Sequence, residues 1–184
     1  MMEANVRQEL EQIRDGITPE TRITVLSGAG ISAASGIPTF RGKQDSLWSQ
    51  YRPEELATPG AFARDPELVW RWYDWRRGLI ADSEPNAAHQ ALARLEATSK
   101  VVIVTQNVDG YHQRAGNRRV LEYHGNIWVV RCLTCGHERV DLTVPLPIPP
   151  ECERCGNLVR PGVVWFGEGI DPEVMSESER EAFQ

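Results

Sequence analysis

The sequence predicts an α/β fold in which a Rossmann-like parallel sheet carries a helical insertion and a small metal-binding module. Two short apolar runs rich in β-branched residues, ITVL at 23–26 and VVIV at 101–104, are typical of buried parallel strands. More than seventy residues separate them, whereas a crossover between parallel strands needs only about a dozen. A helical module is therefore expected between the strands. Two C-x-x-C pairs further along the chain predict the metal-binding module.

The first strand is followed by the small-residue stretch SGAGISAASG at 27–36. Gly28, Gly30 and Ala33 fit the spacing G-x-G-x-x-G/A, in which backbone amides face a diphosphate at the start of a helix. Dinucleotide-dependent dehydrogenases place a second strand with an acidic end about twenty residues after these glycines. Here IPTFRGKQDSLW at 37–48 has no strand pattern. The loop therefore predicts nucleotide binding outside that class of enzyme.

Two helices are predicted between the strands. Asp65-Pro66-Glu67 is typical of a cap and first turn, and a second helix is expected from Asn86 to about Glu96. His89 lies on this second helix and is expected to pack inside the fold rather than react. The first helix has one apolar stripe at helical spacing, formed by Leu68, Trp72, Trp75 and Leu79.

Polar side chains follow the second strand, where TQNVDG places Gln106, Asn107 and Asp109 at its carboxyl end. An amide and a carboxylate there can orient a polar ring that bears a carboxamide. LEYHGN then sets His124 beside a glycine, and VVWF at 163–166 is a third candidate strand. Because ligands of open α/β sheets bind beyond the carboxyl ends of the strands, the site is expected at this edge.

The four cysteines predict a metal site. Cys132 and Cys135 form one C-x-x-C, Cys152 and Cys155 form another, and sixteen residues separate the pairs, as in a four-thiolate zinc ribbon. Four protein ligands leave no open position for water or substrate, so the zinc is expected to be structural. His137 is a further candidate ligand, although we expect it to face solvent in a polar loop. The proline-rich TVPLPIPP between the pairs predicts a connector without helix.

Composition limits the classes of partner. The chain has 41% hydrophobic and 25% charged residues and a net charge of −6, which argues against a phosphate-binding surface for nucleic acid. No apolar run approaches the roughly 18 residues of a spanning helix, and the charged N-terminal stretch has no apolar signal segment. We expect a cytoplasmic protein with no membrane and no nucleic-acid partner.

The motifs together resemble those of sirtuins, the NAD-dependent protein lysine deacylases. GAGISAASGIPTFRG, TQNVDGYHQRAG, EYHGN, the paired C-x-x-C motifs and VVWFGE occur in the family's order and cover nearly everything from residue 23 to 168. The resemblance implies a Rossmann-like NAD-binding domain formed by 1–41, 99–129 and 161–184. The helical insertion of the small domain would be 42–98, and the zinc-ribbon module would be 130–160.

The resemblance also implies the roles of individual residues. His124 would be the general base, with Asn107 also catalytic. Val164, Trp165 and Phe166 would supply a strand edge for the acyl-lysine peptide. The cofactor-binding residues would be Gly28, Ala29, Gly30, Ser32 and Ala33 around the diphosphate, Thr39, Phe40, Arg41 and Trp48 in a mobile loop, and Gln106, Asn107, Val108 and Asp109 at the nicotinamide and its ribose.

In the family, NAD is consumed as an electrophilic co-substrate and carries no hydride. The resemblance therefore implies release of nicotinamide, free lysine and O-acyl-ADP-ribose, with acyl-lysine proteins or peptides as substrates. Tyr73 and Arg76 lie three apart on one helix face, and an arginine fork with a phenol suits a buried carboxylate. The other interpretation of this pair is a surface arginine and a half-buried tyrosine. In class III, desuccinylase-like sirtuins such a pair recognises succinyl and malonyl lysine, so removal of these groups is expected beside deacetylation.

The sequence ends where the family continues. The resemblance implies further strands after residue 184, so the sheet encoded here is expected to be incomplete and the protein truncated at its C-terminus. This keeps an alternative open, a catalytically impaired remnant that binds NAD and zinc and acts as a binding or regulatory module. A zinc-ribbon module for nucleic acid ranks third. Its basic residues near the cysteines, which acids offset, are Arg131, Arg139, Arg154 and Arg160.

Overall fold

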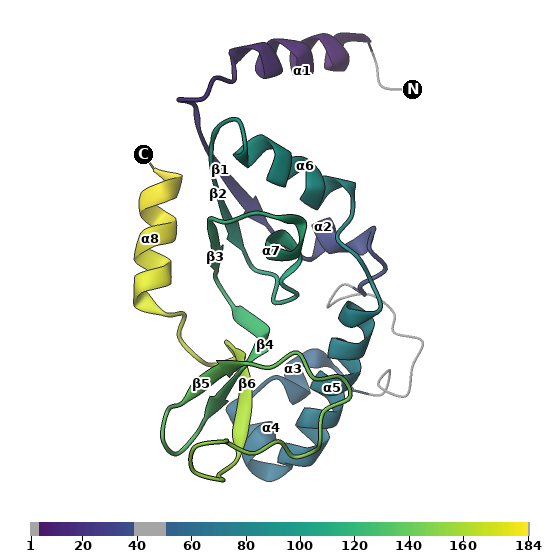
Figure 1. Cartoon of the computed structure of the whole chain (residues 1–184), viewed down its shortest axis with the longest axis vertical. Coiled ribbons are helices and arrows are strands. Elements are labelled where there is room, and N and C mark those ends of the chain that lie inside the picture. Colours follow the sequence, from purple (N-terminus) through teal and green to yellow (C-terminus); the bar gives the residue numbers. More distant parts are fainter. Residues whose placement is uncertain (1–3, 39–50, 184) are drawn as a thin grey trace.

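A computed structural model describes residues 4–38 and 51–183. Figure 1 shows an elongated molecule with a parallel sheet in its upper half and a second, antiparallel sheet with packed helices in its lower half. Helix α1 (Ala4–Gly16) lies at the upper end, beyond the strands. Of the helices in the described residues, none combines the length and the apolar character needed to cross a bilayer.

The parallel sheet has the order β1-β2-β3, from Arg22–Ser27, Lys100–Thr105 and Val120–Glu122. In β2 every residue from Val101 to Thr105 is buried, as expected of a central parallel strand. The two predicted strands are thus confirmed. The third candidate was wrong, because 164–166 is not a strand and β3 takes that place.

Helices cover both sides of this sheet in Figure 1. Helix α6 (Ala87–Glu96) packs on β2 and on α7 (Tyr111–Ala115), and α8 (Pro172–Ala182) lies beside β3 on the other side. Asn86 caps α6 by accepting a hydrogen bond from the N–H of Ala88, so the predicted start of this helix is confirmed. The short helix α2 (Ala29–Ala33) follows β1 directly.

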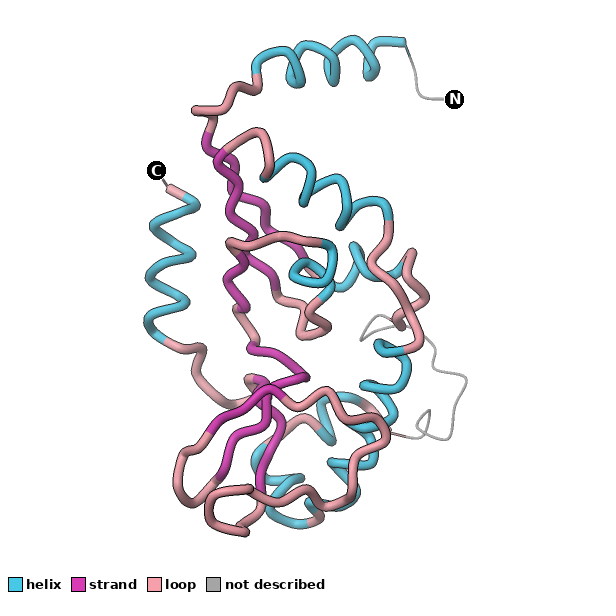
Figure 2. The backbone as a smooth tube through the Cα atoms, in the orientation of Figure 1, coloured by secondary structure: helices cyan, strands magenta, loops and turns pink. Residues whose placement is uncertain are grey.

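The lower half combines three helices with the antiparallel sheet β5-β4-β6 (Figure 2). The strands are Gly125–Cys132 (β4), Glu138–Val140 (β5) and Val159–Val163 (β6), and the predicted boundary at residue 160 passes through β6. The connector at 143–150 contains no helix, as predicted. The helices are α3 (Pro53–Leu56), α4 (Pro59–Arg64) and α5 (Pro66–Ala81).

The buried face of α5 differs from the predicted stripe. Trp72 is buried, but the other three members of the stripe are only partly buried. Helix α5 packs against both β4 and β6, and the carbonyl group of Asp141, just after β5, accepts a hydrogen bond from Arg77 on this helix. The spacing of apolar residues could not show that two arginines of α5 lie on its buried face. The remaining buried residues of the helix are Val69, Trp70, Tyr73, Arg76, Arg77 and Ile80.

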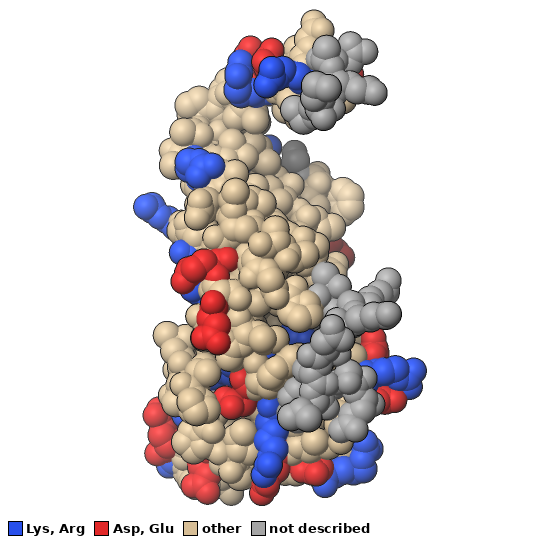
Figure 3. Space-filling model, turned by 90° about the vertical axis from the view of Figure 1, so that its right-hand side faces the viewer, with Lys and Arg blue, Asp and Glu red and all other residues tan. Residues whose placement is uncertain are grey.

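Charged side chains of both signs gather over the lower half of the molecule. On the face in Figure 3, blue and red side chains are interspersed there, while most of the upper half is tan. Ion pairs also form on helices α3 and α5 of the lower half, between Arg52 and Glu55 at 2.8 Å and between Arg71 and Glu67 at 3.3 Å. On this face the charge is mixed, rather than the single-sign surface by which proteins attract a polyanion.

Candidate active site

The glycine loop joins β1 to α2 in an open conformation. Gly28 is the N-cap residue of α2, has extended backbone angles (φ −144°), and offers no side chain to the first turn. A Cβ placed on Gly28 or Gly30 would meet no heavy atom within 4 Å. The backbone here therefore faces open space, as a loop that receives a diphosphate must. Ala29 and Ala33 are also small, so the predicted residues 28–33 fit a nucleotide.

A hydrogen-bond network joins this loop to the end of β2. Asn107 donates through Nδ2 to the carbonyl oxygen of Gly28 and to Ser32 Oγ, both at 3.1 Å. Ser32 Oγ in turn donates to Asp109 Oδ2 at 2.6 Å. All three polar side chains are buried, with 2% of Ser32, 9% of Asn107 and 5% of Asp109 exposed. The predicted residues therefore lie in contact with one another. Because Asn107 Nδ2 makes two hydrogen bonds within the protein, the side-chain oxygen Oδ1 is the polar atom of this amide that is left to bind a ligand.

The Asp109 turn is held from two further directions. Asp109 Oδ1 accepts a hydrogen bond from the N–H of Tyr111 at 3.0 Å. Its carbonyl oxygen accepts one from Trp128 Nε1 at 2.9 Å. Gly110 follows with a φ of +76°, a left-handed conformation that favours glycine. The geometry of this corner is therefore fixed before any ligand binds.

Two buried histidines lie behind the network. His112 Nε2 is 2.9 Å from Ser27 Oγ. The hydroxyl group of Ser27 donates its hydrogen to Thr105 Oγ1 at 2.9 Å. The rings of His89 and His112 lie 5.0 Å apart, centre to centre. Burial, with the neighbouring His89 second, lowers the pKa of His112 to about 4, so this ring is neutral at physiological pH. His89 is fully buried, which confirms that it packs inside the fold.

His124 lies at the same edge of the sheet. Its Nδ1 is 3.1 Å from the carbonyl oxygen of Gln106, and the Gln106 N–H donates to the Ser27 carbonyl at 3.0 Å. Because a carbonyl oxygen only accepts, Nδ1 carries the hydrogen and Nε2 carries the lone pair in the neutral ring. This is the tautomer that a general base requires. The ends of β1, β2 and β3 thus bring the predicted base beside the predicted NAD-binding corner.

The segment Val164–Phe166 is fixed by its backbone. Val164 N–H donates to the His124 carbonyl and Phe166 N–H to the Ala57 carbonyl, both at 2.9 Å. Trp165 N–H donates to Glu168 Oε2 at 2.8 Å. All three N–H groups are used inside the protein, so a peptide would have to pair with this segment through its carbonyl groups or through the residues that follow.

Arg160 holds Glu168 in place beneath this segment. Arg160 Nη2 donates to Glu168 Oε2 and to the Val163 carbonyl, both at 2.8 Å, and its guanidinium lies 3.6 Å from the centre of the Trp165 ring. Burial opposes the charge of Glu168, but Arg160 and the Trp165 N–H outweigh it and lower the pKa of this carboxyl. Sequence reasoning missed this pair, because its members lie eight positions apart in a stretch with no periodic pattern.

Tyr73 and Arg76 are both buried on α5, with 4% and 8% exposed, rather than lying at the surface. Tyr73 Oη accepts a hydrogen bond from Trp165 Nε1 at 3.0 Å, and burial raises the pKa of Tyr73 to about 12. Arg76 lies within electrostatic range of Tyr73 and Asp109, while burial lowers its pKa. A small cleft beside Arg76 is lined by Ile37, Pro38, Trp75, Leu79 and Ile80.

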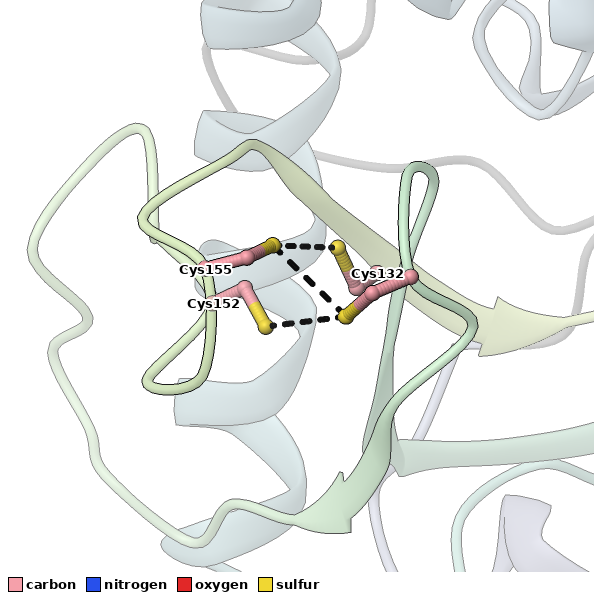
Figure 4. A group of neighbouring side chains, drawn as sticks. Cys132, Cys152 and Cys155 are labelled. Carbon is pink, nitrogen blue, oxygen red and sulfur yellow. Dashed lines mark hydrogen bonds between the residues drawn. The ribbon is translucent and has the colours of Figure 1, made fainter.

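The four predicted cysteines form one cluster. Their Sγ atoms all lie within 4.8 Å of one another, and Figure 4 shows the sulfurs pointing toward a common centre. The two knuckles lie at the ends of β4 and β6, with Cys132 and Cys152 buried and their partners exposed. Four thiolates at this spacing suit a structural zinc ion. His137 is not part of the cluster and contacts Glu153 at 2.9 Å.

The structure therefore brings most predicted site residues into one region. The glycine loop, residues 106–109, His124 and 164–166 are linked by the hydrogen bonds above, and Arg76 approaches them from α5. Thr39, Phe40, Arg41 and Trp48 lie outside the described residues. Trp128 and Arg77 were missed by sequence reasoning, because nothing in the pattern of β4 or α5 shows which carbonyl group an indole or a guanidinium will reach.

This combination of a glycine loop, a polar corner at the strand ends and a separate thiolate cluster defines a nucleotide-binding α/β protein with a structural metal module. Residues 28–183 match the Sir2 family. The chain belongs to this family.

Relatives and solved structures agree. The chain is 60% identical over 158 residues to an NAD-dependent protein deacylase of Aquifex aeolicus, covering 85% of this chain and 66% of that protein. It is 50% identical over 173 residues to NAD-dependent protein deacylase 1 of Archaeoglobus fulgidus, covering 93% and 70%. A crystal structure of a Sir2 homologue in complex with NAD has a TM-score of 0.83 at 49% identity, covering 93% of this chain and 67% of that one. The chain thus spans about two thirds of the length of these relatives.

Proposed function

We propose that this protein removes acyl groups from protein lysine at the expense of NAD, giving nicotinamide and O-acyl-ADP-ribose. The observation that carries the proposal is the network in which Asn107 and Ser32 join the glycine loop to Asp109 beside a histidine of defined tautomer. Relatives named NAD-dependent protein deacylases and a similar structure that contains NAD support it.

The protein's own residues have distinct roles in this proposal. When bound, NAD supplies an electrophilic ribose carbon and a leaving nicotinamide. The open backbone at Gly28 and Gly30 receives the diphosphate, and Asn107 and Asp109 orient the carboxamide and the ribose. His124 accepts a proton from a ribose hydroxyl at Nε2, because its Nδ1 hydrogen is held by Gln106.

The peptide substrate is proposed to lie along Val164–Phe166. The carbonyl groups of this segment would accept its N–H groups, since the segment's own N–H groups are engaged. A structure similar to this protein at 29% identity and a TM-score of 0.78 contains a deacetylated p53 peptide and 3′-O-acetyl ADP-ribose. This supports a peptide that carries acyl-lysine as the second substrate.

We also propose that the pocket accepts acidic acyl groups, succinyl and malonyl, beside acetyl. The guanidinium of Arg76 is buried near Tyr73 and Asp109, at the corner where the acyl group would meet the ribose. A carboxylate that enters this low-dielectric region would gain a charge-assisted hydrogen bond. The protein is proposed to act in the cytoplasm, where a reducing environment keeps the four cysteines available to a metal.

The test is a product balance. The protein is incubated with NAD and matched acetyl-lysine and succinyl-lysine peptides, and the products are weighed by mass spectrometry. Equal amounts of nicotinamide, deacylated peptide and O-acyl-ADP-ribose are expected from both peptides. Binding of NAD and zinc without nicotinamide release would contradict the proposal and support the binding or regulatory module instead.

The acidic acyl preference is tested by Arg76→Met in the same assay. We expect desuccinylation to fall at least tenfold while deacetylation stays within about threefold, because only the succinyl group loses an ionic partner. The control is Arg71→Met on the same helix, where the arginine is exposed and pairs with the exposed Glu67. An equal loss of both activities in Arg76→Met would contradict a role in acyl recognition.

A further inference from the structure

Trp128 on β4 touches the turn that presents the nicotinamide-binding residues. Its indole Nε1 donates to the Asp109 carbonyl at 2.9 Å. A Cβ placed on Gly110 would lie 3.3 Å from Trp128 Cδ1, so the ring packs directly against the turn. The neighbouring Ile127 N–H donates to the Val108 carbonyl at 2.9 Å. Strand β4 therefore holds the turn at Val108–Gly110 by one backbone and one side-chain hydrogen bond.

Arg77 on α5 packs against this indole. Its side chain is fully buried, and its guanidinium carbon lies 5.0 Å from the centre of the Trp128 ring. Arg77 Nη2 donates to the carbonyl oxygen of Asp141 and lies 3.7 Å from that residue's carboxylate. The Asp141 N–H donates back to the Trp128 carbonyl at 2.7 Å. Helix α5 therefore contacts the Trp128 indole through Arg77, and the segment just after β5 holds both Arg77 and the Trp128 backbone.

We propose that Trp128, braced by Arg77 and Asp141, is a positioning residue that fixes the Asn107–Gly110 turn and thereby sets the affinity for NAD. The inference rests on the proposed function only for the identity of the ligand. Trp128 acts through the Asp109 carbonyl and does not touch the reacting atoms. Its role is distinct from that of Ser32, which holds the Asp109 carboxylate from the side of the glycine loop.

The test compares two tryptophans that each donate to a buried carbonyl. Trp128→Phe keeps an aromatic side chain on β4 but removes the N–H donor together with part of the indole ring. Trp70→Phe is the matched control, because Trp70 Nε1 donates to the Val159 carbonyl at 2.8 Å within the lower half of the molecule. NAD affinity is measured by calorimetry and hydrogen exchange by NMR at the Tyr111 amide, which is bonded to Asp109 Oδ1.

We expect Trp128→Phe to weaken NAD binding and raise the KM for NAD about three- to tenfold, the range for one lost hydrogen bond, with kcat at saturating NAD nearly unchanged. The Tyr111 amide should exchange faster by a similar factor. Trp70→Phe should lower the thermal unfolding temperature without either effect. Arg77→Met should reproduce the Trp128→Phe phenotype in part.

Unchanged NAD affinity and unchanged Tyr111 exchange in a folded Trp128→Phe protein would overturn the inference. An equal loss of affinity in Trp70→Phe would also overturn it, since the effect would then reflect general destabilisation. If the unsubstituted protein binds no NAD, the proposed function fails, and the exchange rate of the Tyr111 amide still decides whether Trp128 fixes the turn.

Discussion

Two histidines of this protein differ in role because their environments differ. His124 is half-buried, and a carbonyl oxygen at Nδ1 leaves its Nε2 ready to accept a proton. His112 is 1% exposed and bonded to Ser27, and burial lowers its pKa to about 4. The first is therefore suited to proton transfer, whereas the second serves as a neutral part of the support behind the Asp109 corner.

The lowered pKa of His112 predicts a stability change with pH. The unfolded protein takes up this proton near pH 6.5 but the folded protein only near pH 4, so protonation favours unfolding between these values. The free energy of unfolding should fall by up to about 3 kcal/mol from pH 6.5 to 4, and less steeply in His112→Gln. Urea titrations across this range measure both slopes. An identical slope in the variant would show that His112 does not contribute.

The residue scale also shows what a sequence can predict about a site. Gln106, Asn107 and Asp109 follow a strand directly, so their place at the sheet edge could be inferred from the order of the residues. His124 follows a strand too short to recognise, and its role was assigned by resemblance. The indole of Trp128 packs directly on Gly110 and donates to the Asp109 carbonyl, and no spacing in the sequence encodes that approach.

At the scale of elements, β4 and β6 hold together the segments proposed for catalysis and for peptide binding. A Cβ at Gly125, which follows His124, would lie 2.2 Å from the Gly162 carbonyl oxygen, so only glycine allows the strands to approach this closely. Arg160, on β6, then fixes Glu168 and through it the Trp165 backbone. The segment 164–166 is therefore an ordered edge without being a regular strand.

Glu168→Gln tests this clamp. The change removes the charge that pairs with Arg160 and weakens the bond to the Trp165 N–H, so we expect a loss of about 1–3 kcal/mol in unfolding free energy. The KM for peptide should rise several-fold while the affinity for NAD is retained. Chemical denaturation and steady-state kinetics provide the two readouts. Unchanged peptide KM would mean that Glu168 stabilises the fold without ordering the peptide edge.

Elements with a strong local pattern were predictable, and those that depend on partners were not. β1, β2 and α6 have clear apolar runs or caps and were confirmed. β3 has three residues and forms because β2 lies beside it, so its own sequence carries little signal. On α5 the charged Arg77 is buried because the loop at Asp141 receives its guanidinium, while Arg76 is buried beside Trp72 and within electrostatic range of Tyr73 and Asp109.

At the scale of the whole molecule, the thiolate cluster lies at the end of β4 in the antiparallel sheet, whereas residues 106–109 follow β2 of the parallel sheet (Figure 1). They are connected through β4, which runs from Gly125 beside His124 to Cys132 in the cluster. Arg77 and Asp141 add a second connection from the loop after β5 to Trp128. A metal ion at the cysteines can therefore stabilise the conformation of β4 and of the residues beside His124 without taking part in the reaction.

Removal of zinc should unfold the lower half first. Structural zinc contributes folding free energy directly, so a strong chelator should lower the unfolding temperature markedly and abolish deacylation. Metal analysis should find one zinc ion per protein molecule, and Cys135→Ser should reproduce the chelated state. A metal-free protein with unchanged unfolding temperature would contradict a structural role for the cluster.

In the proposed mechanism, three segments far apart in the sequence meet around one NAD ribose. These are the glycine loop, the corner at 106–109 and His124, linked by hydrogen bonds from Asn107 to Gly28 and from His124 to Gln106. Each segment has a separate role in this proposal, because the corner is proposed to hold the nicotinamide and the histidine to accept a proton afterwards. Variants that remove one of these roles at a time can therefore distinguish nicotinamide binding from proton transfer.

The most direct measurement is exchange of labelled nicotinamide into NAD in the presence of an acyl-lysine peptide, followed together with product formation. We expect His124→Ala to retain exchange while product formation falls by about 10²–10⁴, because the base acts only after nicotinamide has left. Asn107→Ala should lose both. Product formation by His124→Ala at the rate of the unsubstituted protein would contradict the account.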